Sequence, residues 1–344
     1  MKLFLHKLFH WEYWPFQLVY VPIYLLWIWY AIKSKSLFFF NACNPTIKNG
    51  GFFNESKKEI YDLMPPSYYP KTSLIKTPIS FEKLLEIKES QDFDYPFIVK
   101  PDVGLRGSAV KKIEDENSFF QYWKKAQFDF LIQDFIPFPH EIGVFYVRFP
   151  SEKQGKLTGI VAKEFLEIEG NGIDTVRDLI LKNPRFAIQL QVLEREFGNQ
   201  ILKILPKGEK QKLVPYGNHA RGAKFLDCSH WISPNLTNVI DQICLQIDGF
   251  YFGRIDLMYD NLSDLEAGKN FSIVEINGAG SEPTHIYDPR HSIFFAWKEL
   301  SRHITMMYQI SAQNHQNGIP FLSFGEGVKE FRLHNEQNIK ITNF

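Results

Sequence analysis

Two short apolar segments, 253–259 and 271–276, limit the fold of this chain more than any other feature of its sequence. Each is too short for a typical helix, and a polar, acidic stretch separates them, so the pattern predicts two paired strands. Other strand-like and helical segments follow along the chain without an internal repeat, which predicts the α+β class. The expected strands are 37–43, 97–100, 130–134, 142–149 and 158–165, and the expected helices are 55–63, 81–90, 117–126, 175–181, 236–247 and 294–308.

The paired strands carry three oxygen-bearing side chains at positions where they can meet. Glu275 and Asn277 are two residues apart on one strand and share a face, and Asp256 joins them across the pair. The flanking Val274 and Ile276 assign the opposite face to the core. Two carboxylates and an amide suit Mg²⁺ whose coordination phosphate oxygens complete. The alternative is a sheet edge with solvated acids.

Three cationic side chains lie at positions where a positive charge is expected to have an anionic partner. Arg254 shares the face of Asp256. Lys100 leaves the strand 97–100 beside a glycine-containing loop, and Lys163 lies in mid-strand among apolar residues. A phosphate group would satisfy each of them. The alternatives are a solvated lysine at a strand end and a lysine that extends to the edge of its strand.

The N-terminal segment is rich in aromatic residues and uncharged from Trp14 to Ile32. A helix of this length is about 28 Å long, close to the roughly 30 Å hydrocarbon core of a bilayer. Pro22 in its middle, and Trp and Tyr side chains spread along it, favour an element lying in the membrane interface over one that spans. Packing against the protein's own body or a second subunit is the third reading. No small-residue cleavage site follows, so a removed signal peptide is not expected.

Composition narrows the function classes. The 344 residues include 39 Lys plus Arg and 39 Asp plus Glu. A chain without net charge has no bulk attraction to nucleic acid, so no nucleic-acid partner is expected. Three cysteines far apart in the sequence fit neither a disulfide framework nor a zinc site and indicate a reducing compartment. Cys43 is expected to be a core residue.

The order of these motifs resembles the ATP-grasp superfamily. YFGRIDLMYD followed by FSIVEINGAGS looks like a stretch of the D-alanine–D-alanine ligases, and VAKEFLEIEGNGIDTVRDLI and NHARGAKFLD look like the cyanophycin synthetase and glutathione synthetase-like branch. The resemblance covers roughly residues 70–310. It implies two α+β subdomains that sandwich ATP, preceded by a short, divergent N-terminal region and an aromatic helix. The implied parts are a membrane-associating segment (1–36), a substrate-side region (37–75), an ATP-grasp domain (76–312) and a polar C-terminal tail (313–344).

The resemblance also implies where ATP and Mg²⁺ bind. Two lysines would hold the phosphates, a glycine loop would close over them, and a hinge would meet the adenine through its backbone. Two Mg²⁺ ions, or Mn²⁺ in their place, would bind to carboxylate and amide oxygens. The matching residues are Lys100 and Lys163 for the phosphates, Gly104, Gly107 and Ser108 for the loop, Gln133, Asp134, Phe135 and Ile136 for the hinge, Glu141 for the ribose, and Asp256, Glu275 and Asn277 for the metals.

Catalysis and substrate binding are assigned by the same resemblance. Arg254 would stabilise the transferring phosphoryl group and the tetrahedral intermediate, with Lys163 beside it. The candidate substrate residues are His219 and Arg221, cationic groups that would bind the acceptor's carboxylate or phosphate, and Gly278 and Ser281 after the metal strand. For His219 and Arg221 the alternative is a solvated loop with no such role.

The sequence departs from the family in three places. The hinge usually carries an acidic residue where Gln133 stands, and the span from there to Glu141 is one residue longer. The usual Pro-Gly step after Asn277 is missing. Most of the family's N-terminal substrate domain is missing as well, which leaves only residues 37–75 in its place.

The implied function is an ATP- and Mg²⁺-dependent carboxylate–amine ligase that joins an acid to an amino acid or peptide through an acyl phosphate. The aromatic N-terminus suggests a membrane-borne or lipid-linked substrate, and hence a cytoplasmic enzyme at the inner face of the membrane. A homodimer is compatible with the sequence. The alternatives are a phosphotransferase with a hydroxyl acceptor and a non-catalytic ATP-binding protein, although the intact set of lysines and metal ligands speaks against the latter.

Overall fold

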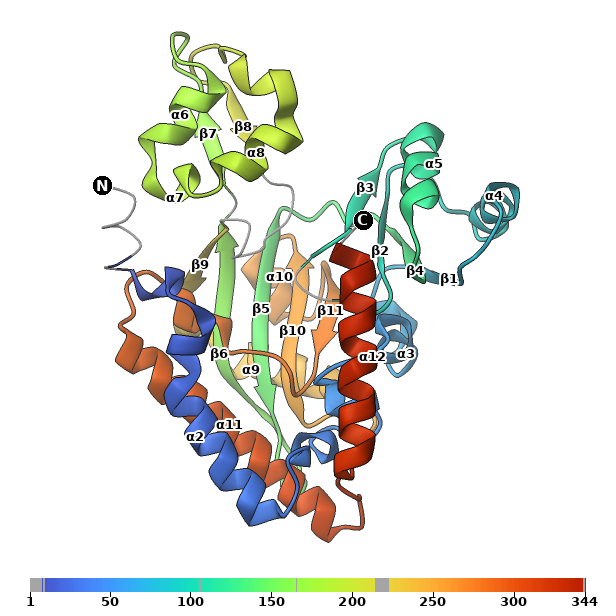
Figure 1. Ribbon diagram of the computed structural model, residues 1–344, viewed down its shortest axis with the longest axis vertical. Coiled ribbons are helices and arrows are strands. Elements are labelled where there is room, and N and C mark those ends of the chain that lie inside the picture. The colour runs from blue at the N-terminus through green and yellow to red at the C-terminus, as the bar shows by residue number, and fades with distance from the viewer. Residues whose placement is uncertain (1–7, 9, 105–106, 165, 214–222, 343) are drawn as a thin grey trace.

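A five-stranded antiparallel sheet forms the centre of the structure, in the strand order β11-β10-β5-β6-β9 (Figure 1). The computed structural model describes residues 8, 10–104, 107–164, 166–213, 223–342 and 344. The hairpin expected in the C-terminal half is present as β10 and β11, and the α+β class is confirmed. The strands of this sheet are β5 (His140–Val147), β6 (Lys156–Glu164), β9 (Lys224–Asp227), β10 (Phe252–Tyr259) and β11 (Phe271–Asn277).

The two faces of the central sheet have different surroundings because side chains alternate along each strand. Val144 of β5 points into a core shared with α9 (Pro234–Cys244). Phe145 points the other way, into a core shared with α11 (Ile293–Gln316). Further along β5, on the face of Phe145, Glu141 lines a cleft instead. One face of the sheet therefore borders the core at one end and the cleft at the other.

A second sheet, in the order β1-β4-β2-β3, lies beside the first. Leu84 and Phe119, from two helices over this sheet, are fully buried against Phe97. β1 (Thr72–Ile75) pairs with β4, so this sheet begins before residue 76, where the sequence places the domain boundary. Its other elements are α4 (Phe81–Ser90), β2 (Phe97–Pro101), β3 (Lys111–Ile113), α5 (Glu116–Lys125) and β4 (Phe130–Asp134), and of these α4 and β4 have the bounds expected from the sequence.

A third, smaller unit is inserted between β6 and β9 and has a hydrophobic core of its own. Its two strands pair with each other and not with the central sheet. From the sequence only one helix was expected here. The elements are β7 (Glu167–Glu169), α6 (Val176–Lys182), α7 (Pro184–Ala187), α8 (Leu190–Phe197), η5 (Gly198–Leu202) and β8 (Lys210–Lys212).

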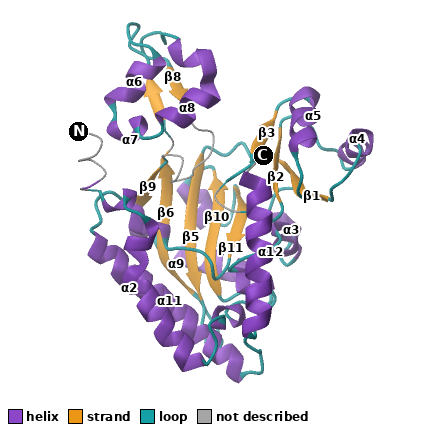
Figure 2. Cartoon of the chain, viewed as in Figure 1, coloured by secondary structure: helices purple, strands orange, loops and turns teal. Residues whose placement is uncertain are grey.

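The aromatic N-terminal segment forms α2 (Phe16–Ser34), which runs alongside α11 (Figure 2). The helix continues through Pro22. Val19, Tyr20, Ile23 and Tyr30 are buried on its inner face, while most of its remaining side chains are exposed. In the part of the chain that the structure describes, α2 is the one helix long and apolar enough to cross a membrane.

Residues 37–43 do not form the expected strand but a 3₁₀ turn, η2 (Phe39–Ala42). Phe39 and Phe40 are buried against Trp27 of α2. An apolar run signals burial, and in this case the burial is against helices, with the Asn41 side chain bonded to the backbone of 320–322. Burial in a run this short does not separate a strand from a turn.

The C-terminal residues do not form a polar tail, because 313–316 complete α11 and most of the rest forms α12 (Phe324–Thr342). At one end of α12, Phe324 contacts Phe38. At the other end, Ile341 is buried and Phe344 packs on Tyr122 of the second sheet. The helix thus connects two parts of the molecule (Figure 1). The remaining elements are η1 (Trp11–Tyr13), η3 (Lys48–Gly51), α3 (Lys57–Asp62), η4 (Pro66–Tyr68), η7 (Ser229–Trp231), α10 (Leu262–Glu266) and η8 (Thr284–Tyr287).

Candidate active site

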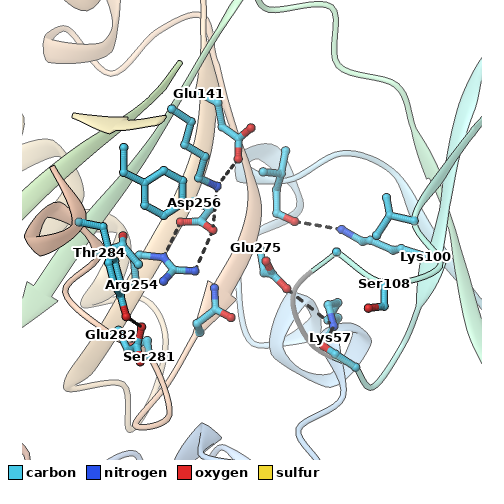
Figure 3. A pocket seen from close by; sticks show the side chains of 18 of the residues that line it. Lys57, Lys100, Ser108, Glu141, Arg254, Asp256, Glu275, Ser281, Glu282 and Thr284 are labelled. Atoms are coloured by element: carbon cyan, nitrogen blue, oxygen red, sulfur yellow. Dashed lines mark hydrogen bonds and ion pairs between the residues drawn. The ribbon is translucent and has the colours of Figure 1, made fainter. Parts of the chain in front are cut away.

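A cleft of about 920 Å³ is lined by residues of both sheets (Figure 3). The rest of its wall comes from the small inserted unit and from the N-terminal segment. Every residue that the sequence assigns to ATP, to metal or to catalysis lines this cleft. The motifs are far apart in the chain, and the fold brings them to one cleft.

Asp256 lies at the centre of a cluster of buried charges. Nε of Arg254 donates to its Oδ1 at 2.8 Å, and Nη2 donates to its Oδ2 at 3.1 Å. Lys163 donates to Asp256 Oδ2 at 3.3 Å and to the carboxylate of Glu141. Burial alone would raise the pKa of Asp256, but the two cations lower it to about 2. Gly143 leaves room for this cluster, since a Cβ there would lie 2.8 Å from Asp256 Oδ1.

Lys163 has the anionic partners that its position among apolar residues demands. Burial alone would lower its pKa, but Asp256 and Glu141 raise it above the ordinary lysine value. Burial raises the pKa of Glu141, and Lys163 offsets only part of that effect. The lysine therefore stays charged in the cleft and is already neutralised by two carboxylates.

A β-bulge in β11 aims a backbone carbonyl at Lys100. The pairing of β10 with β11 shifts by one residue after Asp256, so Val274 is an extra residue in β11. Its carbonyl oxygen accepts a hydrogen bond from Lys100 Nζ at 3.0 Å. Val274 lines the cleft, and only Ile276 points into the core, which corrects the expectation that both share the apolar face.

Lys100 is a buried cation surrounded by neutral acceptors. Besides Val274, its Nζ donates to Tyr61 Oη at 2.9 Å and to Gln133 Oε1 at 2.8 Å. Burial lowers its pKa to about 8, although Glu275 and one further carboxylate act in the opposite direction. An anionic phosphate would supply the opposite charge that Lys100 lacks at hydrogen-bond distance.

Lys57, in the first turn of α3, is a cleft residue that the sequence did not single out. Its Nζ donates to the carbonyl of Gly104 at 3.0 Å and lies 3.7 Å from Glu275 Oε1. It therefore connects the glycine loop to the metal strand. A lysine in a polar helical turn carries no signal of this role, because its partners are distant in sequence.

The glycine loop and the hinge form two further walls of the cleft. Gly107 has φ +68°, a left-handed conformation that suits glycine. Gln133, where the family's hinge is acidic, accepts from Lys100 and donates to Thr72 Oγ1 at 2.7 Å. The other cleft residues in these two walls are Gly104, Ser108, Asp134, Phe135 and Ile136.

The predicted metal ligands suit Mg²⁺ because they keep oxygen lone pairs that no hydrogen bond occupies. Asp256 already accepts three hydrogen bonds, which leaves one of its roughly four lone-pair sites. The Glu275 side chain is 33% exposed, so its carboxylate is open to the cleft. Few ligands with room for phosphate oxygens are typical of Mg²⁺ in ATP sites. The described residues contain no group of three or more His, Cys, Asp or Glu side chains that could hold a metal.

The substrate residues assigned from the sequence fare differently. Ser281 lines the cleft. Gly278 does not line it, which corrects its assignment: a Cβ there would lie 2.5 Å from the Gly50 carbonyl oxygen, so this glycine serves close backbone packing. His219 and Arg221 lie outside the described residues. Cys43, expected in the core, is buried there.

The N-terminal segment contributes aromatic rings to the cleft that the sequence did not predict. Trp11 and Tyr20 line it together with Tyr287 and Glu282 from the segment after β11. Glu12 is joined to Arg185 of the small unit at 3.1 Å. The tryptophans spread along the N-terminal segment favoured a place in the membrane interface. Only the fold shows that one end of this segment faces the cleft.

Comparisons with protein-family models and with curated proteins give no match. Solved structures do resemble the chain. They include a bifunctional glutathione synthetase from Pasteurella multocida (14% identity, TM-score 0.38, 71% of this chain and 35% of that one) and a D-alanine–D-alanine ligase from Bacillus anthracis (12%, 0.43, 76% and 69%). A third is the VanG D-Ala:D-Ser ligase from Enterococcus faecalis (14%, 0.42, 74% and 61%).

The chain spans about a third of the length of the glutathione synthetase. At these identities and TM-scores the likeness does not assign the site, and the roles of its residues rest on the geometry described above.

Proposed function

We propose that this chain is a Mg²⁺- and ATP-dependent ligase that joins a carboxylate to an amine. The observation that carries the proposal is that four cationic and three anionic side chains from distant parts of the chain lie among the residues lining one cleft between two sheets. Such a site suits a polyanion with bound divalent cations. The cations are Lys57, Lys100, Lys163 and Arg254, and the anions are Glu141, Asp256 and Glu275.

The proposed reaction has two steps. The substrate carboxylate attacks the γ-phosphorus of ATP, ADP leaves, and an acyl phosphate forms. The amine then attacks the acyl carbon, phosphate leaves, and the amine's surplus protons pass to phosphate and solvent. Lys100 and Lys163 hold the phosphates, and Arg254 stabilises the charge on the transferring group. Mg²⁺ held by Asp256, Glu275 and Asn277, or Mn²⁺ in its place, would neutralise phosphate charge.

Water must be kept from the acyl phosphate, because hydrolysis would waste it. Two cleft walls are placed to do this. The glycine loop is held by Lys57 through the Gly104 carbonyl. Phe197 and Leu213 of the small inserted unit add apolar surface to the cleft.

We further propose that the outward face of α2 contacts an anionic membrane surface on the cytoplasmic side. Leu25, Trp29 and Ile32 are 60–68% exposed on this face. Lys33 and Lys35 are exposed at the end of the helix, where they would meet acidic headgroups. The other end of the same helix lines the cleft. A lipid-linked acid or amine would therefore reach the cleft from the membrane surface.

The test of the ligase proposal is ADP and phosphate release by the purified full chain with Mg·ATP, amino acids, small peptides and membrane extract. Release that requires an added amine, with a new amide among the products, is the expected result. Glu275→Ala should abolish it. Glu336→Gln, which removes an exposed carboxylate on α12, is the control that should retain it.

Other products would decide against the ligase. A phosphorylated hydroxyl acceptor without amide would establish a phosphotransferase instead. Mg²⁺-dependent nucleotide binding with no turnover of any acceptor in the pool or the extract would favour an ATP-binding protein without catalysis. Hydroxylamine added to the reaction should give a hydroxamate if an acyl phosphate forms.

A further inference from the structure

Glu282 is a cleft carboxylate with no cation at ion-pair distance among the described residues, although its charge acts on the nearby Arg254. It lines the cleft close to Arg254, on the side away from Lys100 (Figure 3). Its two oxygens accept hydrogen bonds from tyrosines of two different segments: one from Tyr20 of α2, the other from Tyr287 Oη at 2.9 Å. Each oxygen keeps a lone pair for a further donor. The proposed ligase chemistry leaves this carboxylate without a task.

Aromatic rings surround the carboxylate. Trp11 stacks on Tyr287 with a centroid distance of 5.5 Å, and Phe16 stacks on Tyr20 at 4.0 Å. All four rings line the cleft. A carboxylate in a cleft that aromatic rings also line is a combination that recognises an organic cation, through an ion pair and cation–π attraction together.

A buried polar atom at this end of the cleft has no hydrogen-bond partner among the described residues. It is Oγ1 of Thr284, which lines the cleft. A buried polar group without a partner costs free energy, so such atoms in a cleft indicate a ligand that satisfies them. Thr284 is two residues from Glu282, and its hydroxyl can accept a third hydrogen bond from an ammonium group.

We propose that Glu282, with Tyr20, Tyr287 and Thr284, forms the subsite for the ammonium group of the acceptor substrate. The acceptor is then a primary amine that binds as its ammonium and loses one proton to solvent before it attacks the acyl carbon, and the rings of the N-terminal segment make up its wall. This inference rests on the proposed ligase function and names the end of the cleft at which the amine enters. The subsite also explains why the N-terminal segment forms a hydrogen bond with Glu282 in addition to packing on α11.

The test uses alaninamide and lactamide, which differ in carrying an ammonium group or a hydroxyl, at a pH where alaninamide is protonated. The indole N–H resonance of Trp11, which donates to the His291 carbonyl at 2.8 Å, reports binding to the full chain. It is assigned by its loss in Trp11→Phe. Alaninamide should shift it and lactamide should not. Glu282→Gln should weaken alaninamide binding about tenfold or more, because a charge-assisted contact is lost.

Controls keep the result decisive. Glu336→Gln removes an exposed charge and should leave the titration unchanged. If Glu282→Gln fails to fold, Glu282→Asp keeps the charge and should still prefer alaninamide over lactamide. Equal shifts with both compounds, or unchanged binding in Glu282→Gln, would overturn the subsite. Amide formation unaffected by Glu282→Gln would also overturn it while leaving the ligase standing. Alaninamide binding without any ATP turnover would retain the subsite and remove the ligase.

Discussion

Lys100 shows how a residue's surroundings set its chemistry. Three neutral oxygens hold its Nζ, and burial lowers its pKa to about 8. A bound phosphate would favour the charged form, so nucleotide binding should take up a proton whenever the free lysine is neutral.

The affinity for ATP should therefore fall as the pH rises above about 8, and approach a tenfold loss per pH unit. Below that pH, Lys100 is already protonated and the affinity should be level. The measurement is the dissociation constant of ATP across this range by calorimetry. Lys100→Met should bind more weakly and show no such fall, and a fall that persists in that variant would assign the effect to another group.

The charge of Asp256 contributes to stability. Its carboxylate neutralises Arg254 and Lys163, and the sign of its pKa shift means that this stabilisation exists above the ordinary aspartate pKa and is lost as the pH falls toward 2. Asp256→Asn keeps the shape but leaves two buried cations short of an anion. The free energy of unfolding in urea should fall by about 3–5 kcal/mol. Asp260→Asn, at an exposed site on the same hairpin, should change it little.

The sequence predicted residues of the site best where strand alternation leaves no choice. Glu275 and Asn277 share a face because they are two apart, and pairing places Asp256 opposite Glu275. Lys57 and Glu282 could not be found in this way. They reach the cleft from a helical turn and a loop. Their local sequence does not indicate which distant residues they contact.

Among the elements, α2 combines a packed face with an exposed apolar face. Its inner face is buried on α11, whereas its outer face leaves large apolar side chains in water. The sequence predicted the helix but left three surroundings open. The structure shows that packing on the protein's own body accounts for one face only.

Replacing Leu25, Ile28 and Trp29 by serine should abolish sedimentation with vesicles that contain anionic phospholipid. These side chains are 52–67% exposed, and each contributes up to about 1.5–3 kcal/mol when buried in an apolar phase. The matched control replaces Phe331 and Ile339, exposed apolar residues of α12, and should still sediment. The wild-type chain could instead fail to bind vesicles and form dimers that the triple variant does not form. That result would make this face a subunit interface.

Two elements were misjudged from sequence for the same physical reason. Residues 37–43 have the composition of a buried strand, and residues after 313 that of a solvated tail. In both cases the deciding contacts are long-range. Phe39 is buried against α2, and Glu330 of α12 accepts hydrogen bonds from Asn49 and Asn54. Local pattern reports how apolar a segment is but not what it packs against.

At the scale of the whole molecule, α12 links the parts that form the cleft. Ile341 is 4% exposed, and its Cδ1 lies so close to Gly104 that a Cβ there would come within 2.9 Å. The packing of the C-terminal helix therefore supports the glycine loop from behind.

Ile341→Ala should lower the free energy of unfolding by about 2–5 kcal/mol and weaken ATP binding, because the loop loses its support. The two effects are measured by urea unfolding and by nucleotide titration. Ile339→Ala, at a position 61% exposed on the same helix, should change either by little. Unchanged ATP affinity in a destabilised Ile341→Ala would separate the helix from the site.

The bulge at Val274 has a consequence for how this chain tolerates insertions and deletions. A strand usually resists both, since one residue more or less turns every later side chain to the opposite face. Here β11 already contains one extra residue, Val274, and the carbonyl oxygen of that residue accepts a hydrogen bond from Lys100. Deleting Val274 would give β11 a more regular ladder and remove the contact between the two sheets. Variants selected for stability alone could therefore lose Val274, whereas variants selected for turnover would keep it.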